Sequence, residues 1–165
     1  MAISPKSHDY NARLVWNGNL GQGTSTYPGY GREYTIFILG KPDLEGSADP
    51  MFRGKGEVHN PEDLFVAAIV SCHMLSYLAL CARRGLSVTS YEDTATGVLV
   101  FDNKGGGRFE RVTLHPAVTI VDGSRYDEAM ALHDTAHEQC YIASSCNTEI
   151  HHVATVNVET VVEGR

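Results

Sequence analysis

One long stretch of this chain carries no charged side chain. Asp, Glu, Lys and Arg are all absent from Leu64 to Ala82, a length close to the roughly 20 residues that a helix needs to cross a bilayer. Polar residues interrupt the stretch, Cys72 and His73 among them. A helix that is apolar on all sides can equally form the centre of a soluble protein. We therefore expect a long buried central helix and no membrane partner.

Both ends of this helix have local signals. Asn60 is a suitable N-cap, Pro61 fits the first helical position, and Asp63 can complete a reciprocal capping pair with Asn60. Gly85 is a natural residue for the C-terminal end, where a left-handed backbone is common. These signals predict a helix that starts at residue 61 and stops just before Gly85.

The N-terminal part reads as a meander of short strands separated by glycines and prolines. The predicted strands are 13–16, 24–27 and 34–39. Residues 40–59 are rich in Gly, Pro and Asp, so we expect a long loop there, and loops of that length are usually functional.

The C-terminal part predicts further strands and a second helix. Strands are expected at 94–102 and 108–120, joined as a hairpin across 104–107, and at 156–162. A helix is expected at 126–139, with Ala129, Leu132 and Ala136 on one side. Antiparallel strands broken by two helices indicate an α+β fold, and the length of 165 residues fits one domain, residues 1–165.

Charge and cysteine content limit the possible functions. The formal net charge is −7, which argues against a nucleic-acid partner because phosphate binding needs a clustered basic face. The first residues have no apolar segment typical of a signal peptide. We therefore expect a cytoplasmic protein whose four cysteines are kept reduced. Under these conditions the cysteines favour a redox role, because stable structural disulfides are not expected.

Two of the cysteines stand in unusual places. Cys72 lies midway along the apolar helix between Ser71 and His73, and Cys140 ends the second helix. A reactive thiol needs a nearby cation or hydrogen-bond donor, and Arg53 and Arg32 are the candidates. Cys81 and Cys146 are better interpreted as small buried apolar residues.

The helix geometry also constrains the site. Glu62 could orient an arginine, but ten residues of helix separate it from Cys72 by about 15 Å. Two such helices that cross antiparallel near Ala67 and Ala68 would bring Glu62 of one copy toward Cys72 of the other. This arrangement predicts a homodimer with shared sites.

Histidines support an alternative function. His133, His137 and Cys140 recur on one face of the second helix and could present metal ligands. The pair His151-His152 could add another ligand, but a fourth ligand is not evident and the pattern lacks the glutamate of the metalloprotease motif. A metal-binding protein is therefore the alternative to a redox protein.

Two segments together resemble the OsmC/Ohr family of thiol-dependent peroxidases. They are Asn60 to His73, which contains Asn-Pro-Glu and a cysteine ten residues after the glutamate, and Ala136 to Ser145, which contains Ala-His-x-x-Cys. Residues 91–93 and 112–116 also look like the OsmC-like branch. Tyr141 stands where the Ohr branch tends to have proline, which favours the OsmC-like branch.

The resemblance implies a fold and a mechanism. The fold is an intertwined α+β homodimer with antiparallel sheets. Cys72 would be the peroxidatic cysteine and Cys140 the resolving one, Glu62 the helix glutamate, and Arg53, with Arg32 in reserve, the arginine.

The substrate implied is an organic hydroperoxide, the reductant implied is a dithiol such as a lipoyl-type compound, and no cofactor is required. Apolar walls from Phe65, Ile69 and Tyr141 would suit an alkyl hydroperoxide. The other alternative is a non-catalytic binding protein with the same fold.

Overall fold

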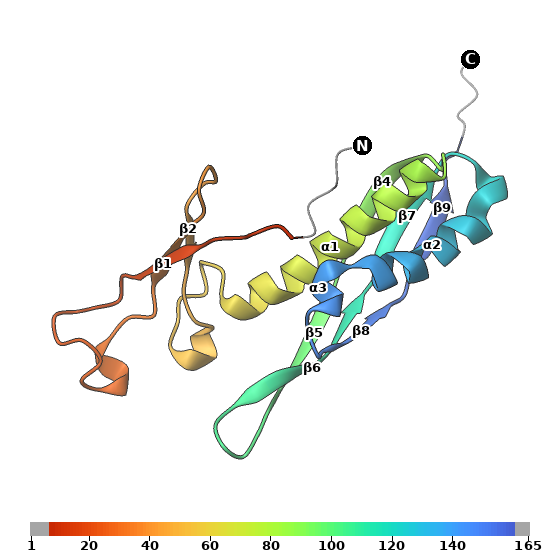
Figure 1. Ribbon diagram of the computed structural model, residues 1–165. Coiled ribbons are helices and arrows are strands. Elements are labelled where there is room, and N and C mark those ends of the chain that lie inside the picture. The colour runs from red at the N-terminus through yellow and green to blue at the C-terminus, as the bar shows by residue number, and fades with distance from the viewer. Residues whose placement is uncertain (1–6, 161–165) are drawn as a thin grey trace. The chain divides into compact units, whose positions relative to one another are not determined.

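The computed structural model describes residues 7–160, which divide after Leu64 into two compact units. The ribbon shows the course of the chain (Figure 1). The first unit contains a three-stranded antiparallel sheet of β1 (Arg13–Trp16), β2 (Tyr34–Phe37) and β3 (Leu44–Gly46), in that order. Two of the strands predicted in this region are therefore present.

Two predictions for the first unit were wrong. The segment 24–27 is not a strand but leads into a short 3-10 helix, Tyr27–Gly29, with Pro28 in its first turn. The segment 40–59 is not one irregular loop, since it contains β3 and a second 3-10 helix, Pro50–Phe52. The start of the 3-10 helix Pro50–Phe52 is stabilised by Asp49, whose carboxylate accepts a hydrogen bond from the Met51 N–H at 2.7 Å.

The long helix α1 (Pro61–Arg83) has the predicted ends. The Asp63 N–H donates to Asn60 Oδ1 at 2.7 Å, and the Asn60 N–H donates to Asp63 Oδ2 at 3.3 Å, as in a capping box. Gly85 has φ +64°, the left-handed conformation that a glycine adopts without strain. Local sequence therefore sets both ends of α1.

The second unit contains two three-stranded sheets. One has the order β4 (Val88–Asp93), β7 (Pro116–Ile120), β9 (Thr155–Val158), and the other β5 (Thr96–Phe101), β6 (Gly107–Leu114), β8 (Glu149–His152). The β5–β6 hairpin is as predicted. The sheets are mixed rather than antiparallel, because β6 pairs with β8 and β7 with β9 in parallel.

The predicted strand 108–120 is in fact two strands that belong to different sheets. The break falls at His115, whose N–H donates to Asp93 Oδ1 at 2.8 Å, and Pro116, which has no N–H, begins β7. Proline is tolerated at the first residue of a strand. At the C-terminal end, β9 stops at Val158, and the predicted continuation to Val162 lies outside the described residues.

The second helix, α2 (Tyr126–Gln139), has the predicted bounds, and its predicted apolar face is buried. A single-turn helix, α3 (Tyr141–Ser144), follows directly, with Cys140 between them. In Figure 1, α1 and α2 run over the strands β4, β7 and β9, and residues of both helices and of this sheet share one core cluster. The sheet therefore holds both helices.

Helix α1 contributes to two clusters of the core. Ile69 packs with Val112 and Leu114 of β6, and Tyr77, Leu80 and Cys81 pack with residues of β7, α2 and β9. Only 28% of its most apolar window is buried within the chain, so the predicted burial applies to one face. Among the described residues it is the one helix that is long and apolar enough to span a membrane, by length and composition alone.

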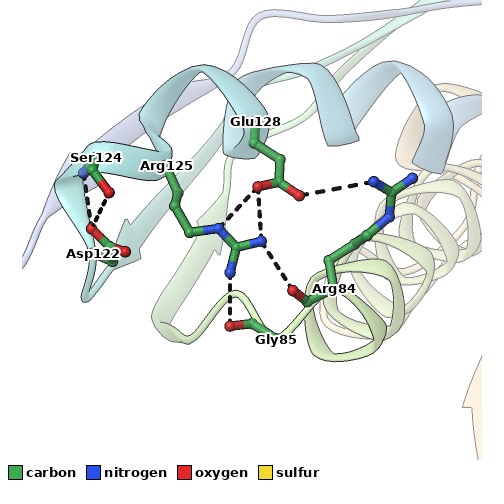
Figure 2. A network of polar contacts seen from close by, with 6 residues as sticks. All are labelled: Arg84, Gly85, Asp122, Ser124, Arg125 and Glu128. Carbon is green, nitrogen blue, oxygen red and sulfur yellow. Dashed lines mark hydrogen bonds and ion pairs between the residues drawn. The ribbon is translucent and has the colours of Figure 1, made fainter.

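An arginine links the end of α1 to the start of α2 (Figure 2). The Arg125 guanidinium donates to the Gly85 carbonyl at 2.8 Å and the Arg84 carbonyl at 3.0 Å. It also donates to Glu128 Oε2 at 2.9 and 2.7 Å. A cation at free C-terminal carbonyls is stabilising. These contacts fix α2 relative to α1, and thereby the helices that carry Cys72 and Cys140.

Candidate active site

The fold brings together the two cysteines singled out by the sequence. The thiols of Cys72 on α1 and Cys140 at the end of α2 interact directly, and both are free. Cys140 is 1% exposed, whereas Cys72 is half-buried. The more accessible thiol is thus the one for which the sequence predicts the first reaction, with a buried thiol beside it.

Two causes make Cys140 a weak acid. Burial raises the pKa of its thiol, and the neighbouring Cys72 thiol raises that pKa further. The Ala143 N–H donates to Cys140 Sγ at 3.4 Å, which acts in the opposite direction. Cys140 is therefore a thiol, not a thiolate, at neutral pH, and needs a base before it can attack another sulfur.

The other two cysteines differ from this pair. Cys81 is buried in the core between α1 and the sheet of β4, β7 and β9, and burial raises the pKa of its thiol. It is therefore a packing residue, as predicted. Cys146 is half-buried, and its Sγ donates to the Ala143 carbonyl at 3.5 Å. Cys146 thus lies just beyond the one-turn helix that follows Cys140.

Four histidines cluster on the same elements as the thiol pair. His73 Nε2 and His133 Nδ1 are 3.1 Å apart, and the His133 ring stacks on Tyr77 with centroids 3.9 Å apart. The His152 ring lies 5.6 Å from His73 and 6.0 Å from His137. The sequence suggested His133, His137 and the pair His151-His152 as ligands but did not predict this cluster, because His73 lies on α1 and His152 on β8. The four-residue spacing on α2 was the available signal.

The interior of this cluster is uncharged at neutral pH. Burial, with the nearby His152 and His137, lowers the pKa of His73 to about 4. Burial, with the nearby His73 and His152, lowers the pKa of His133 to about 3. At the surface, His152 Nε2 lies 3.1 Å from the carboxylate of the exposed Asp134. The cluster thus extends from the neutral buried pair of His73 and His133 to the contact between His152 and Asp134 at the surface.

The predicted metal site does not form in this arrangement. Across residues 7–160, no three side chains of His, Cys, Asp or Glu are grouped so that they could hold a metal ion. His133 instead bonds to His73 and stacks on Tyr77. The structure therefore does not bring His133, His137 and Cys140 together as a ligand set.

Arg53 lies in the first unit, in a tight loop. It is exposed, caps the 3-10 helix Pro50–Phe52 and has φ +68°, the one non-glycine residue with positive φ in the described chain. The loop is closely packed, because a Cβ at Gly54 would lie 1.6 Å from the Ala48 carbonyl oxygen. Left-handed conformations at non-glycine residues occur often at functional sites.

Arg32, the reserve arginine, is held by its own loop. Its guanidinium donates to the carbonyls of Tyr27, at 2.7 Å, and Tyr30, and lies over both rings, 4.5 and 3.9 Å from their centroids. These contacts give Arg32 a local structural role. The Arg53 side chain has no hydrogen bond or ion pair within the described residues and is free to bind elsewhere.

Glu62 lies in the first turn of α1, also in the first unit. Burial raises the pKa of the Tyr34 hydroxyl, and the nearby Glu62 carboxylate adds to this effect. Tyr34 therefore lies next to Glu62, and sequence reasoning missed it. Its ring packs on Gly46, where any Cβ would come within 2.5 Å of it, so that glycine is needed for this placement.

The predicted apolar walls are partly wrong. Ile69 is fully buried and Phe65 stacks on Phe109 with centroids 4.9 Å apart, so both side chains are used in the core. Tyr141 is exposed and can contact a ligand. Near it, an open hollow of about 260 Å³ is lined by His137, Glu138, Ala143, Ser144, Thr148 and Ile150.

Residues 54–154 match the family described as OsmC-like protein. This match covers more than half of the chain and includes both cysteine motifs. The chain belongs to the OsmC-like family. No curated protein sequence matches it.

Solved structures have the same fold. An OsmC-like protein of unknown function from Vibrio cholerae is 30% identical, with a TM-score of 0.80 over 90% of this chain and 99% of that one. An organic hydroperoxide resistance protein from Legionella pneumophila is 20% identical, with a TM-score of 0.68 over 92% and 98%. One from Elizabethkingia anophelis is 19% identical, with a TM-score of 0.68 over 94% and 100%. The α+β fold is therefore that of OsmC-like proteins.

Proposed function

We propose that this protein is a thiol-dependent peroxidase that reduces organic hydroperoxides. The Cys72 thiolate attacks the peroxide oxygen, the O–O bond breaks, and Cys72 becomes a sulfenic acid while the alkoxide leaves as an alcohol. Cys140 then attacks the Cys72 sulfur, the S–O bond breaks, and water leaves as the disulfide forms. An external dithiol reduces the disulfide and restores both thiols.

The observation that carries this proposal is the direct interaction of the Cys72 and Cys140 thiols. The accessible member can meet the peroxide, and the buried member is already in place to condense with the oxidised sulfur. Such a partner protects a sulfenic acid from further oxidation. Membership of a family whose structural relatives include proteins named for organic hydroperoxide resistance also supports a role in peroxide resistance.

The other two proposed active-site residues, Arg53 and Glu62, are charged residues of the first unit. Arg53 would stabilise the Cys72 thiolate and the charge on the departing oxygen, and Glu62 would orient that arginine. Because Glu62 and Cys72 are on one helix, we propose that each site takes Glu62 from a second copy, in a homodimer that covers the exposed face of α1.

The reductant and location are part of the same proposal. A dithiol, such as one of the lipoyl type, would reduce the disulfide, and no cofactor is needed. The four free cysteines suit a reducing cytoplasm. No nucleic acid or membrane partner is proposed.

A peroxide-consumption assay with a dithiol tests the proposal. Cys72→Ser should abolish turnover, because serine offers no thiolate near neutral pH, whereas Cys81→Ala, which changes a core thiol on the same helix, should retain it. Turnover in the Cys72→Ser protein would contradict the assignment. A wild-type protein that folds but consumes no peroxide would instead be a non-catalytic binding protein.

A further inference from the structure

The buried thiol of the pair lacks an obvious route for its proton. Cys140 is 1% exposed, so bulk water does not reach its sulfur. Burial and the Cys72 thiol both raise its pKa, yet it must lose a proton to attack Cys72. A base must therefore lie within the protein, close to Cys140.

Among the four clustered histidines, His137 is the one adjacent to this thiol. It lies on α2 three residues before Cys140, which directly follows that helix, and the Cys140 N–H donates to the His137 carbonyl at 3.3 Å. Side chains three residues apart on a helix have Cβ atoms about 5–6 Å apart. His137 is therefore a direct neighbour of Cys140.

The His137 ring is also suited to move a proton. Its Nδ1 is buried and has no hydrogen-bond partner within the described residues. This nitrogen is therefore available to accept a proton. The same side chain borders the open hollow beside α3, through which protons can exchange with solvent.

The other histidines are poorer bases for this step. His73 and His133 are fully buried and bonded to each other, and burial lowers the pKa of both well below neutrality. His152 is engaged by the Asp134 carboxylate. The titratable groups around His137 are Cys72 and His73 from α1, His133, Asp134, Glu138 and Cys140 on or after α2, and His152 from β8.

We propose that His137 is the proton acceptor for Cys140 when the disulfide forms, a role that rests on the proposed peroxidase function. The Cys140 proton moves to His137 Nδ1 as the Cys140 sulfur attacks Cys72. The S–S bond forms and the S–O bond of the sulfenic acid breaks. The departing hydroxide takes the proton from the imidazolium and leaves as water. Cys140 is oxidised and Cys72 is reduced, with the hydroperoxide as the original oxidant.

The test is a rapid-quench experiment on reduced protein mixed with cumene hydroperoxide, in which sulfenic acid and disulfide are counted by mass spectrometry. His137→Gln should form the Cys72 sulfenic acid at the wild-type rate but the disulfide about 10²-fold more slowly, a typical loss for a general base. The matched control is His151→Gln, a neighbouring exposed histidine paired with Glu149 at 3.2 Å, which should behave as wild type.

The pH dependence separates a base from a merely structural residue. His137→Gln should change the pH profile of disulfide formation: with only hydroxide left to take the Cys140 proton, its rate should rise steadily with hydroxide concentration, whereas the wild-type rate should depend on pH less steeply. A His137→Gln protein that forms the disulfide at the wild-type rate, with the wild-type pH profile, would overturn the proposal.

A second assay does not depend on peroxide chemistry. With oxidised glutathione, Cys72 forms a mixed disulfide and releases one glutathione, and Cys140 then displaces the second. His137→Gln should slow only the second release. If the wild type formed no sulfenic acid with peroxide, the proposed peroxidase function would fail. The release of the second glutathione would still test the role of His137. Equal second releases in wild type and His137→Gln would refute its role.

Discussion

His73 Nε2 lies 3.1 Å from His133 Nδ1 inside the protein, and this contact joins α1 to α2 one residue beyond Cys72. Both rings are fully buried, and each has a second nitrogen without a hydrogen-bond partner in the described chain. Protonation of either ring would place a charge in the core. The pair therefore links the stability of the fold to pH.

The pH dependence of stability should follow from these two rings. Burial lowers the pKa of His73 to about 4 and that of His133 to about 3, below the ordinary value of about 6.5 that the unfolded chain has. The unfolded chain therefore binds protons first as the pH falls. The two rings therefore do not change the free energy of unfolding above about pH 6.5. Below that pH they lower it, and the loss grows as the pH falls toward 4.

Urea unfolding between about pH 7 and pH 5 measures this slope, about 1.4 kcal/mol per pH unit for each proton taken up. His133→Gln should reduce the slope, because one buried titrating ring is removed. His151→Gln, on the surface, should leave it unchanged. Equal slopes in all three proteins would show that the buried pair does not set the acid sensitivity.

Cys140→Ser should separate oxidation from recycling. Without the resolving thiol, Cys72 should be oxidised once, recycle poorly and, with excess peroxide, proceed to sulfinic or sulfonic acid. Mass spectrometry of the Cys72 peptide measures this product. Cys146→Ser should behave as wild type. Normal recycling by Cys140→Ser would transfer the resolving role to Cys146, which lies just beyond α3.

The two arginines should give different results when each is replaced by methionine. Arg53→Met should remain folded and form the Cys72 sulfenic acid about 10²-fold more slowly, as expected when a group that stabilises developing charge is removed. Arg32→Met should lower the melting temperature, because the guanidinium binds the Tyr27 and Tyr30 carbonyls. The reverse pattern would assign the active-site role to Arg32.

Features set by neighbouring residues could be predicted from the sequence. The ends of α1 follow from Asn60, Asp63 and Gly85, and α2 follows from a helical repeat that buries Ala129 and Ala136. The proposed roles of Cys72 and Cys140 came from the family motifs, whereas their proximity could be found only from the tertiary structure.

Features set by distant residues could not be predicted. Strand β8 pairs in parallel with β6, a contact across a large separation that no local pattern encodes. The histidine cluster likewise needs α1, α2 and β8 to meet, so the spacing of His133 and His137 pointed to a metal site instead. Burial on one face of α1 was hidden because apolar residues occupy all of its faces.

Arg125 should contribute measurably to stability. Arg125→Ala removes hydrogen bonds to the Gly85 and Arg84 carbonyls and to Glu128 (Figure 2), and we expect a loss of about 1–3 kcal/mol in the free energy of unfolding. The control is Arg111→Ala, which removes an exposed pair with the adjacent Glu110 and should cost less than about 1 kcal/mol. Equal losses would mean that Arg125 does not link the helices.

The last prediction concerns the exposed face of α1. Ala67, Ser71 and Leu75 recur every fourth residue and are exposed, Leu75 by 62%, next to the half-buried Ala68 where two copies are expected to cross. A bulky side chain at such a crossing should cost roughly 1–3 kcal/mol of association energy. Ala67→Leu should therefore weaken the dimer, and turnover should fall with it because the proposed site takes Glu62 and Cys72 from different copies. Ala131→Leu makes the same change on an exposed position of α2 and should affect neither. Light scattering and turnover measured over a dilution series check both effects, and a fully active monomer would refute the shared site.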